Sequence, residues 1–142
     1  MTTEQIQKIA WLNRAFRARK AAEAWKLKYQ QDKIIAERIS GGLASSGARS
    51  GNNATEDALI RLAETERKTK SKIDELIQIQ EEIADKIMEI DDNELQAVLV
   101  YRYLGCMNFE QIAEKMNYDK RTIQRKHKAA LDKVVIECHP RL

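Results

Sequence analysis

The spacing of apolar residues along the chain predicts long helices and no sheet. Residues 3–39 contain no glycine or proline, and their apolar side chains recur at three- and four-residue steps, first regularly (Ile6, Ile9, Leu12, Phe16) and then less so (Leu27, Ile34, Ile35). Residues 55–91 repeat the alternation as a heptad seam with one polar member: Ile73, Leu76, Gln80, Ile83, Ile87 and Ile90. The pattern predicts one long helix over residues 1–40 and a second over residues 55–92.

The segment between these helices has a different composition. Residues 41–54 hold four of the five glycines together with several serines, which predicts a flexible linker. Thr55 is a suitable N-cap for the second helix, because Glu56 and Asp57 then lie in its first turn. Two helices of similar length with such a connection favour an antiparallel hairpin. The alternative is that each seam pairs with the same segment of a second chain.

Charge separates along the chain although its formal net charge is only +3. Residues 1–40 carry nine basic and four acidic side chains, residues 55–94 carry six and thirteen, and residues 95–142 carry nine and five. The two predicted long helices are therefore of opposite net charge, which supports their pairing. The basic first helix is also compatible with binding to phosphates, to a membrane surface or to an acidic partner.

Residues 93–142 show the punctuation of a compact three-helix module. Asp91–Asn93 ends the acidic helix or caps a new one, and Gly105 suits the end of the first short helix. Asn108 and Gln111 have the spacing of a capping box, Asn117–Tyr118 predicts a tight turn, and Asp119 caps a third helix. The residues expected to face inward are Leu95, Val98, Leu99, Leu104, Phe109, Ile112, Ala113 and Met116.

The third helix, residues 120–135, divides into two faces. The apolar positions form one stripe: Ile123, His127, Ala130, Leu131 and Val134. The other face presents Arg121, Gln124, Arg125 and Lys128. Such a helix fits a DNA major groove, where arginine and glutamine pair with guanine and adenine edges. Lysines instead contact phosphates, so the predicted DNA-binding residues are Lys115, Lys120, Arg121, Thr122, Gln124, Arg125 and Lys128.

The motifs of this module carry a family resemblance. The run from Tyr101 to Ala113 (YRYLGCMNFEQIA), followed by Thr122–Ile123 and Ala129–Leu131, resembles region 4 of sigma-70-type factors. The chain as a whole is similar to small phage and prophage proteins near the ArpU and RinA late-transcription regulators. The match covers about 45 residues well. The rest of the chain matches only in architecture.

The resemblance implies a helix-turn-helix domain that binds DNA near promoters, with RNA polymerase as a candidate partner. No segment resembles the sigma region that reads the −10 element and melts DNA, so the chain does not correspond to a complete sigma factor. Arg121 occupies a position that is often acidic in housekeeping sigma factors. The preferred DNA sequence should therefore differ from theirs.

Other chemistry finds little support in the sequence. No Ser/His/Asp or Cys/His arrangement, P-loop or glycine fingerprint is present, so we expect no enzymatic activity, no cofactor and no small-molecule substrate. Cys106, Cys138 and His139 lack zinc spacing, and His127 is expected to be a partly buried structural residue, so no metal site is predicted. No apolar run approaches the roughly 20 residues of a membrane span, and a cytoplasmic location in a bacterial host cell is expected.

These observations predict an all-α, sequence-specific DNA-binding regulator of phage or prophage type. Its helical hairpin would form a homodimer or another homo-oligomer, or bind a partner such as RNA polymerase. One alternative keeps DNA as the ligand but makes the protein a packaging or replication site recogniser that assembles in rings, like a small terminase. Another drops DNA and makes the module an adaptor that binds RNA polymerase through its basic face.

Overall fold

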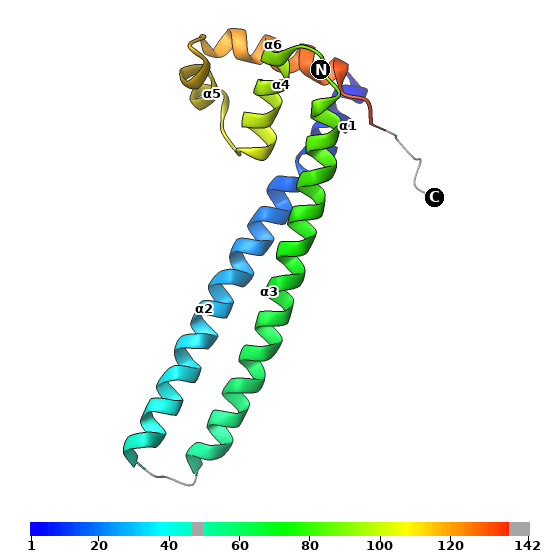
Figure 1. Ribbon diagram of the computed structural model, residues 1–142. Coiled ribbons are helices and arrows are strands. Elements are labelled where there is room, and N and C mark those ends of the chain that lie inside the picture. Colours follow the sequence, from blue (N-terminus) through cyan, green and yellow to red (C-terminus); the bar gives the residue numbers. More distant parts are fainter. Residues whose placement is uncertain (47–49, 137–142) are drawn as a thin grey trace. The chain divides into compact units, whose positions relative to one another are not determined.

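The computed structural model describes residues 1–46 and 50–136, and all regular structure in that part of the chain is helical (Figure 1). The elements are α1 (Thr3–Leu12), α2 (Arg14–Ser46), α3 (Ser50–Met88), α4 (Asn93–Leu99), the π-helix η1 (Val100–Leu104), α5 (Phe109–Met116) and α6 (Lys120–Lys133). Contacts divide the chain into unit 1 (Met1–Arg17 with Ile77–Leu142) and unit 2 (Ala18–Leu76).

The single helix expected over residues 1–40 is instead two helices that meet at Asn13. The backbone of Asn13 has φ −70° and ψ −5°, which ends α1 before α2 begins at Arg14. The Arg14 guanidinium donates to the Trp11 carbonyl over 3.1 Å, and so occupies an acceptor that an unbroken helix would use. Asparagine is a weak helix former, which makes the break inexpensive. The expected apolar stripe is confirmed only in part. Leu12 is fully buried and Ile9 packs against the core, whereas Ile6 and Phe16 are exposed. Gln5 and Lys8 are buried as well.

The predicted linker and the predicted start of the second helix also need correction. Helix α2 continues through Ser46, and α3 begins at Ser50, so Thr55 lies inside a helix and is not an N-cap. Helix α3 ends at Met88, somewhat before residue 92. A glycine within a helix costs only about 0.5–1 kcal/mol relative to alanine, which the long helices tolerate. Of the expected linker, residues 47–49 lie outside the described residues.

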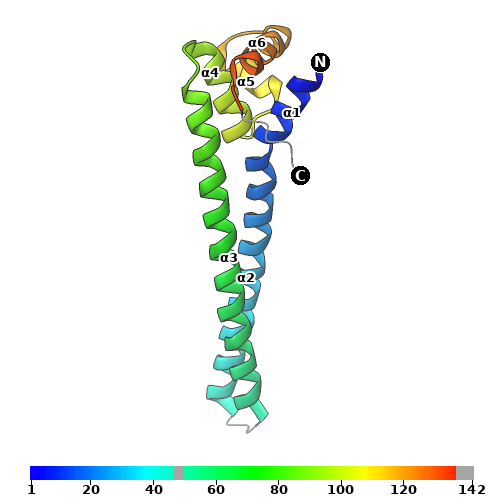
Figure 2. The same cartoon turned by 90° about the vertical axis from the view of Figure 1, so that its right-hand side faces the viewer.

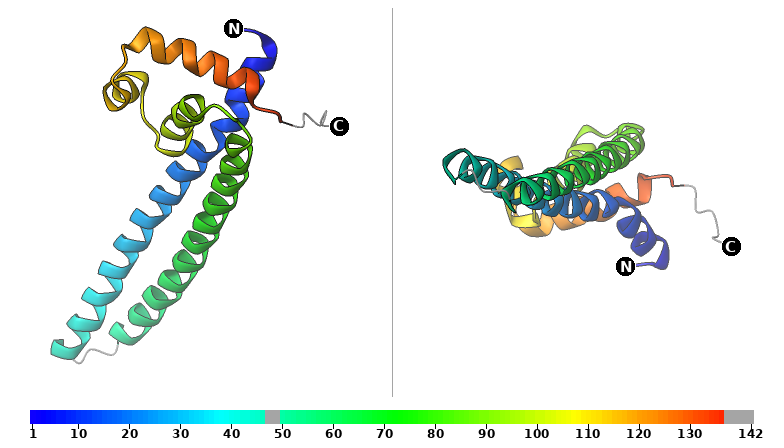
Figure 3. Two further views of the ribbon diagram at one scale, coloured as in Figure 1. Left: turned by 45° about the horizontal axis from the view of Figure 1, so that its top comes forward. Right: turned by 90° about the horizontal axis from the view of Figure 1, so that it is seen from below.

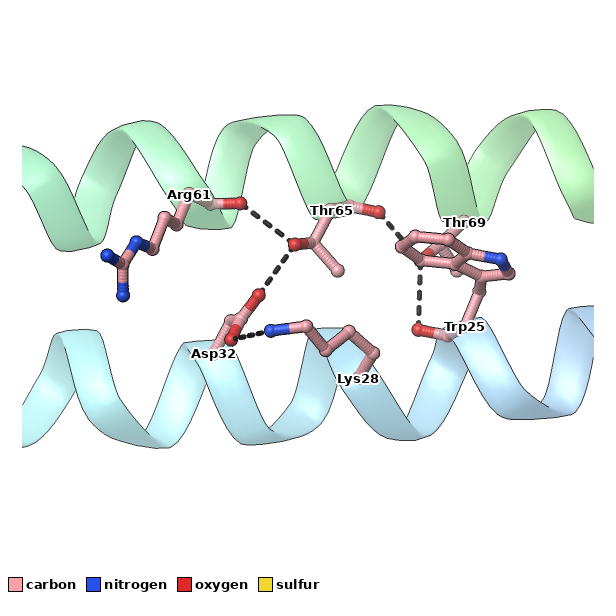
Figure 4. Close-up of polar contacts among 6 residues, drawn as sticks. All are labelled: Trp25, Lys28, Asp32, Arg61, Thr65 and Thr69. Carbon is pink, nitrogen blue, oxygen red and sulfur yellow. Dashed lines mark hydrogen bonds and ion pairs between the residues drawn. The ribbon is translucent and has the colours of Figure 1, made fainter.

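Polar contacts join the two helices of unit 2 (Figure 4). The Asp32 carboxylate, only 6% exposed, accepts a 2.6 Å hydrogen bond from the Thr65 hydroxyl of the opposite helix. It also accepts from the Lys28 ammonium over 2.8 Å. One helical turn away, the Thr69 hydroxyl donates to the Trp25 carbonyl over 3.0 Å. These pairs run in opposite directions along the two helices, so α2 and α3 are antiparallel within unit 2.

The seam of unit 2 is formed by small and polar side chains. Ala22, Ala36 and Ala58 are buried there with Thr65 and Thr69. Five of the larger aliphatic residues are about half exposed: Leu27, Ile34, Ile35, Leu59 and Ile60. Four others are half-buried: Ile39, Leu62, Ile73 and Leu76. The expectation that Leu27, Ile34 and Ile35 line the inner face was therefore wrong. The Asp32 carboxylate lies at this seam. Hydrogen bonds from Lys28 and Thr65 hold the pKa of this carboxyl below its usual value.

In unit 1, α4, α5 and α6 lie together at the C-terminal end of α3 (Figure 2), and the unit is packed around two apolar clusters. The larger cluster gathers side chains from α1, α3, α4, η1 and α6, with Leu12, Ile83, Ile87, Leu99 and Leu131 fully buried in it. The smaller one joins α4, α5 and α6 through Val98, Ile112, Ala113 and Ile123. The C-terminal half of the predicted heptad seam contributes to the larger cluster, because Ile83, Ile87 and Ile90 are all buried there.

A close backbone approach follows η1. Asp92 caps α4 through hydrogen bonds to the amides of Glu94 and Leu95, and the helix then widens into η1. The Gly105 amide donates to the Val100 carbonyl over 2.9 Å, which brings the Gly105 Cα close to the preceding turn. A Cβ at Gly105 would lie 2.8 Å from the Tyr101 carbonyl oxygen. Gly105 itself has an ordinary φ of −87°, and the left-handed residue is Cys106 at φ 56°.

Substitution of Gly105 and of Gly41 should have opposite effects. Gly105→Ala forces backbone atoms apart and should lower the free energy of unfolding by about 1–3 kcal/mol. Gly41→Ala is the matched control, because its Cβ meets nothing within 4 Å in α2 and should raise that free energy by about 0.5–1 kcal/mol. Urea unfolding followed by circular dichroism measures both. Equal stability of the two variants would contradict the close approach at Gly105.

Candidate nucleic-acid interface

Local capping fixes both ends of α5 and the start of α6. Asn108 accepts from the Gln111 amide over 2.8 Å, and the Gln111 side chain accepts from the Asn108 amide over 2.9 Å, which confirms the predicted capping box. Asn117 ends α5 in the left-handed conformation at φ 60°. Asp119 then caps α6 by accepting from the Thr122 amide over 3.0 Å, and hydrogen bonding from Thr122 lowers the pKa of this carboxyl. A turn of two residues thus separates α5 from the cap of α6.

One face of α6 is buried as the sequence predicts. The five members of its predicted stripe are at most 3% exposed: Ile123, His127, Ala130, Leu131 and Val134. Phe109 and Met116 of α5 are half-buried against the same core. The helix is shorter than expected, because it ends at Lys133 and Val134 has an extended backbone with ψ 126°. This extended turn still directs the Val134 side chain into the core.

The opposite face of α6 is open to solvent. Arg121, Gln124, Arg125 and Lys128 are all exposed, at the i, i+3, i+4 and i+7 positions of one helix face. They line one side of a shallow groove of about 380 Å³ whose remaining walls come from Met1, Phe109 and His127. Four of the seven predicted residues are therefore brought together on one surface. Basic and apolar side chains both line this groove.

The other three predicted residues have separate surroundings. Lys120 is exposed at the start of α6, with its ammonium 3.3 Å from the Glu110 carboxylate. Thr122 is half-buried, and its amide is used by the cap of α6. Lys115 is exposed on α5 and lines a different groove with Met107 and Gln111. None of these three lines the groove beside Arg121.

Two basic residues that are not in the predicted DNA-binding set, Lys126 and Arg102, make contacts between the helices of this module. The Lys126 ammonium is 3.5 Å from the Glu94 carboxylate and 5.0 Å from the Tyr118 ring centroid, and its side chain is only 24% exposed. The Tyr118 hydroxyl donates to the same Glu94 carboxylate. The Arg102 guanidinium lies 4.8 Å from the Phe109 ring and donates to the Met107 carbonyl. The contacts of Glu94 with Tyr118 and Lys126 link residues too far apart in sequence for spacing to reveal them.

A buried hydrogen bond anchors the inner face of α6. The Tyr103 hydroxyl and His127 Nε2 are 2.6 Å apart, and the Phe109 ring meets the imidazole edge-on with centroids 5.1 Å apart. Burial, aided by the nearby Arg102 charge, lowers the pKa of His127 to about 4, and burial raises that of Tyr103 to about 12. Both groups are therefore neutral at physiological pH. The predicted structural role of His127 is confirmed by its burial.

Within the described residues, no group of three or more His, Cys, Asp or Glu side chains is placed to hold a metal ion. Cys106 is a free thiol there, and Cys138 and His139 lie outside the described part of the chain. None of the described helices combines the length and hydropathy needed to cross a membrane.

Comparison with known proteins places the chain in a family but gives that family no function. The chain belongs to the family described as "Protein of unknown function (DUF1492)", whose model matches residues 28–134. That range includes most of α2 and all of α3 to α6, so it contains every residue of the predicted DNA-binding set. No curated protein and no solved structure matches the chain. The finer resemblance to sigma region 4 and to the ArpU and RinA regulators is not among these matches.

The His127 contacts predict a pH-dependent stability. Its folded pKa of about 4 lies below the ordinary value of 6.5, so between these values the unfolded chain binds a proton that the folded chain does not. The free energy of unfolding should therefore be intact above pH 6.5 and fall by at most about 3 kcal/mol as the pH drops to 4.

Urea unfolding at several pH values tests this expectation. In His127→Phe, which keeps an apolar ring in place, the part of the pH dependence between 6.5 and 4 should disappear. Tyr103→Phe is the companion control, because it removes the hydrogen bond and leaves the titrating imidazole. An unchanged slope in His127→Phe would show that other groups cause the acid sensitivity.

Proposed function

We propose that the protein is a sequence-specific DNA-binding transcriptional regulator of phage or prophage type, with α5 and α6 as a helix-turn-helix and α6 as the recognition helix. The observation that carries this proposal is the division of α6 into a fully buried apolar face and an exposed face of Arg121, Gln124, Arg125 and Lys128. A basic face alone is usually a solvated surface. Here it sits on a capped helix that follows α5 after a short turn, which is compatible with a helix-turn-helix whose second helix enters the major groove.

The exposed side chains suit the edges of base pairs. Arginine offers two parallel donors to O6 and N7 of guanine, and glutamine pairs with N6 and N7 of adenine. Arg121, Gln124 and Arg125 lie in the first half of α6, where a recognition helix meets the bases. Because their stems rest on a helix anchored by five buried residues, these groups are held on a rigid element. We assign them to base contacts.

The lysines are assigned to the DNA backbone. Lys128 lies further along the exposed face of α6, and Lys115 lies on α5. Lys120 begins α6 beside Glu110, so on binding its ammonium would exchange that exposed carboxylate for a phosphate. Such contacts position the protein without specifying sequence. Exposed ion pairs contribute only about 0–1 kcal/mol, so this exchange costs little.

The long helices are proposed to serve assembly. Unit 2 exposes Leu27, Ile34, Ile35, Leu59 and Ile60, each about half accessible to solvent. Aliphatic side chains at this density on two helices support self-association or binding of a partner such as RNA polymerase. A homodimer would present two copies of α6 to a symmetric site, as many helix-turn-helix proteins do. We expect the protein to act in the bacterial cytoplasm.

Arginine substitutions on α6 test base recognition. Arg121→Ala and Arg125→Ala should each weaken binding to the preferred duplex by about 1–3 kcal/mol and relax selectivity at one base position. Fluorescence anisotropy on that duplex and on a scrambled duplex of equal length measures both effects. An equal loss on the two duplexes would refute base recognition by these arginines.

Lysine substitutions separate positioning from specificity. Lys128→Ala should weaken binding to both duplexes alike and reduce the salt dependence of log Kd by about one phosphate contact. Lys86→Ala is the matched control, because it removes the same charge from α3, where Lys86 lies beside Glu82, Asp85 and Glu89. Its affinity should equal that of the unmodified protein. A comparable loss in Lys86→Ala would point to net charge alone as the cause.

A further inference from the structure

Helix α1 lies outside the family match but is built into unit 1. The match begins at residue 28, whereas α1 spans Thr3–Leu12. Leu12 is completely buried in the larger core cluster, among side chains of α3, α4 and α6. Figure 3 shows α1 beside the C-terminal half of α6. The two helices are far apart in sequence, so specific side-chain contacts must hold them together.

The shortest hydrogen bond between α1 and α6 is made by the Lys8 ammonium. Lys8 is only 6% exposed, and its Nζ donates to the Leu131 carbonyl over 2.8 Å. That carbonyl belongs to the last turn of α6, where it also accepts from the Val134 amide over 3.2 Å and where the helix dipole favours positive charge. The Glu4 carboxylate, 3.5 Å from the same ammonium, offsets part of its charge. Lysine is rarely buried without such partners, so this contact holds α1 on α6.

A second contact fixes the rotation of α1. The Gln5 side-chain amide donates to the Asp132 carboxylate over 2.9 Å, and the Gln5 oxygen accepts from the Thr2 amide. The Thr2 hydroxyl in turn accepts from the Gln5 amide, which completes a capping box. One glutamine therefore both begins α1 and ties it to α6. The first turn of α1 is set in one position relative to α6.

Just before α1 begins, the chain lines the proposed DNA-binding face. Met1 lines the same groove as Arg121, Gln124, Arg125 and Lys128. Thr2 and Thr3, which follow it, are exposed. The surface around the exposed face of α6 thus continues onto the start of α1.

We propose that the first turn of α1 is a second DNA-contacting element, which lies against the sugar–phosphate strand beside the groove that α6 enters. The Lys8 and Gln5 contacts hold it there. This inference rests on the proposed function, since it takes duplex DNA as the partner. It assigns a role in binding to residues that the family match does not include.

Charge changes at Thr3 test the proximity to DNA. Thr3→Lys should tighten binding to the preferred duplex by roughly three- to tenfold and steepen the salt dependence, because a new phosphate contact releases a counterion. Thr3→Glu should weaken binding by a similar factor. An acidic residue in the first turn of a helix favours the fold, so a loss of binding in Thr3→Glu would not come from unfolding.

The same pair of changes at Gln78 provides the control. Gln78 is a neutral, exposed residue of α3 in the same unit, and its two variants alter the net charge equally. Opposite shifts at Thr3 that exceed those at Gln78 support the inference. Equal shifts at the two sites, with binding by the unmodified protein intact, overturn it and leave the proposed function standing. If the unmodified protein binds no duplex, both fail.

The anchoring contact is tested separately. Lys8→Met keeps the length of the side chain but removes the donor to Leu131, so it should reduce the difference in affinity between the two Thr3 variants. Lys8→Gln retains a donor and should restore part of that difference. Circular dichroism establishes that each variant is folded. A full Thr3 effect in Lys8→Met would show that Lys8 does not hold the first turn of α1 near DNA.

Discussion

The structure of unit 1 depends on the burial of one face of α6. Ile123, Leu131 and Val134 are essentially inaccessible to solvent, and His127 meets the Tyr103 hydroxyl in the same interior. Burial of several aliphatic side chains, each contributing about 1.5–3 kcal/mol, fixes the rotation of this helix about its axis. Once that rotation is fixed, the arginines of the opposite face project from the solvent-exposed side of α6. A core interaction thereby determines the surface on which the proposed function rests.

The second organising feature is that α6 receives support from elements distant in sequence. Helix α4 contributes Val98 and Leu99 to the core beneath it, and α1 contributes the Lys8 donor at its last turn. Asp119 caps the first turn. Both ends and the inner face of α6 are thus restrained while its outer face stays free of packing. Such restraint lowers the ordering cost of binding, because the side chains that would meet DNA already sit on a fixed helix.

Features that depend on neighbouring residues were predictable from the sequence. The Asn108 capping box and the Asp119 cap arise from contacts within one helical turn, and the buried stripe of α6 is visible in the three- and four-residue spacing of its own apolar side chains. Features that depend on distant partners were not. The Asn13 break brings Gln5 and Lys8 onto α6, and the composition of residues 3–39 gives no sign of it. In unit 2, the buried hydrogen bond between Asp32 and Thr65 likewise lies at the seam between the helices. The spacing of apolar residues had predicted isoleucines at this seam.

The proposed function depends on recognition of particular base pairs by the exposed face of α6. Selection of bound duplexes from a random library tests this, with the mass of the protein determined by light scattering. We expect an enriched motif, with a palindrome if the protein is a dimer. Direct repeats bound by a closed ring would keep DNA recognition but point to packaging. No enrichment, with binding absent or equally salt-labile on every sequence, would refute base recognition and favour a protein partner for this face.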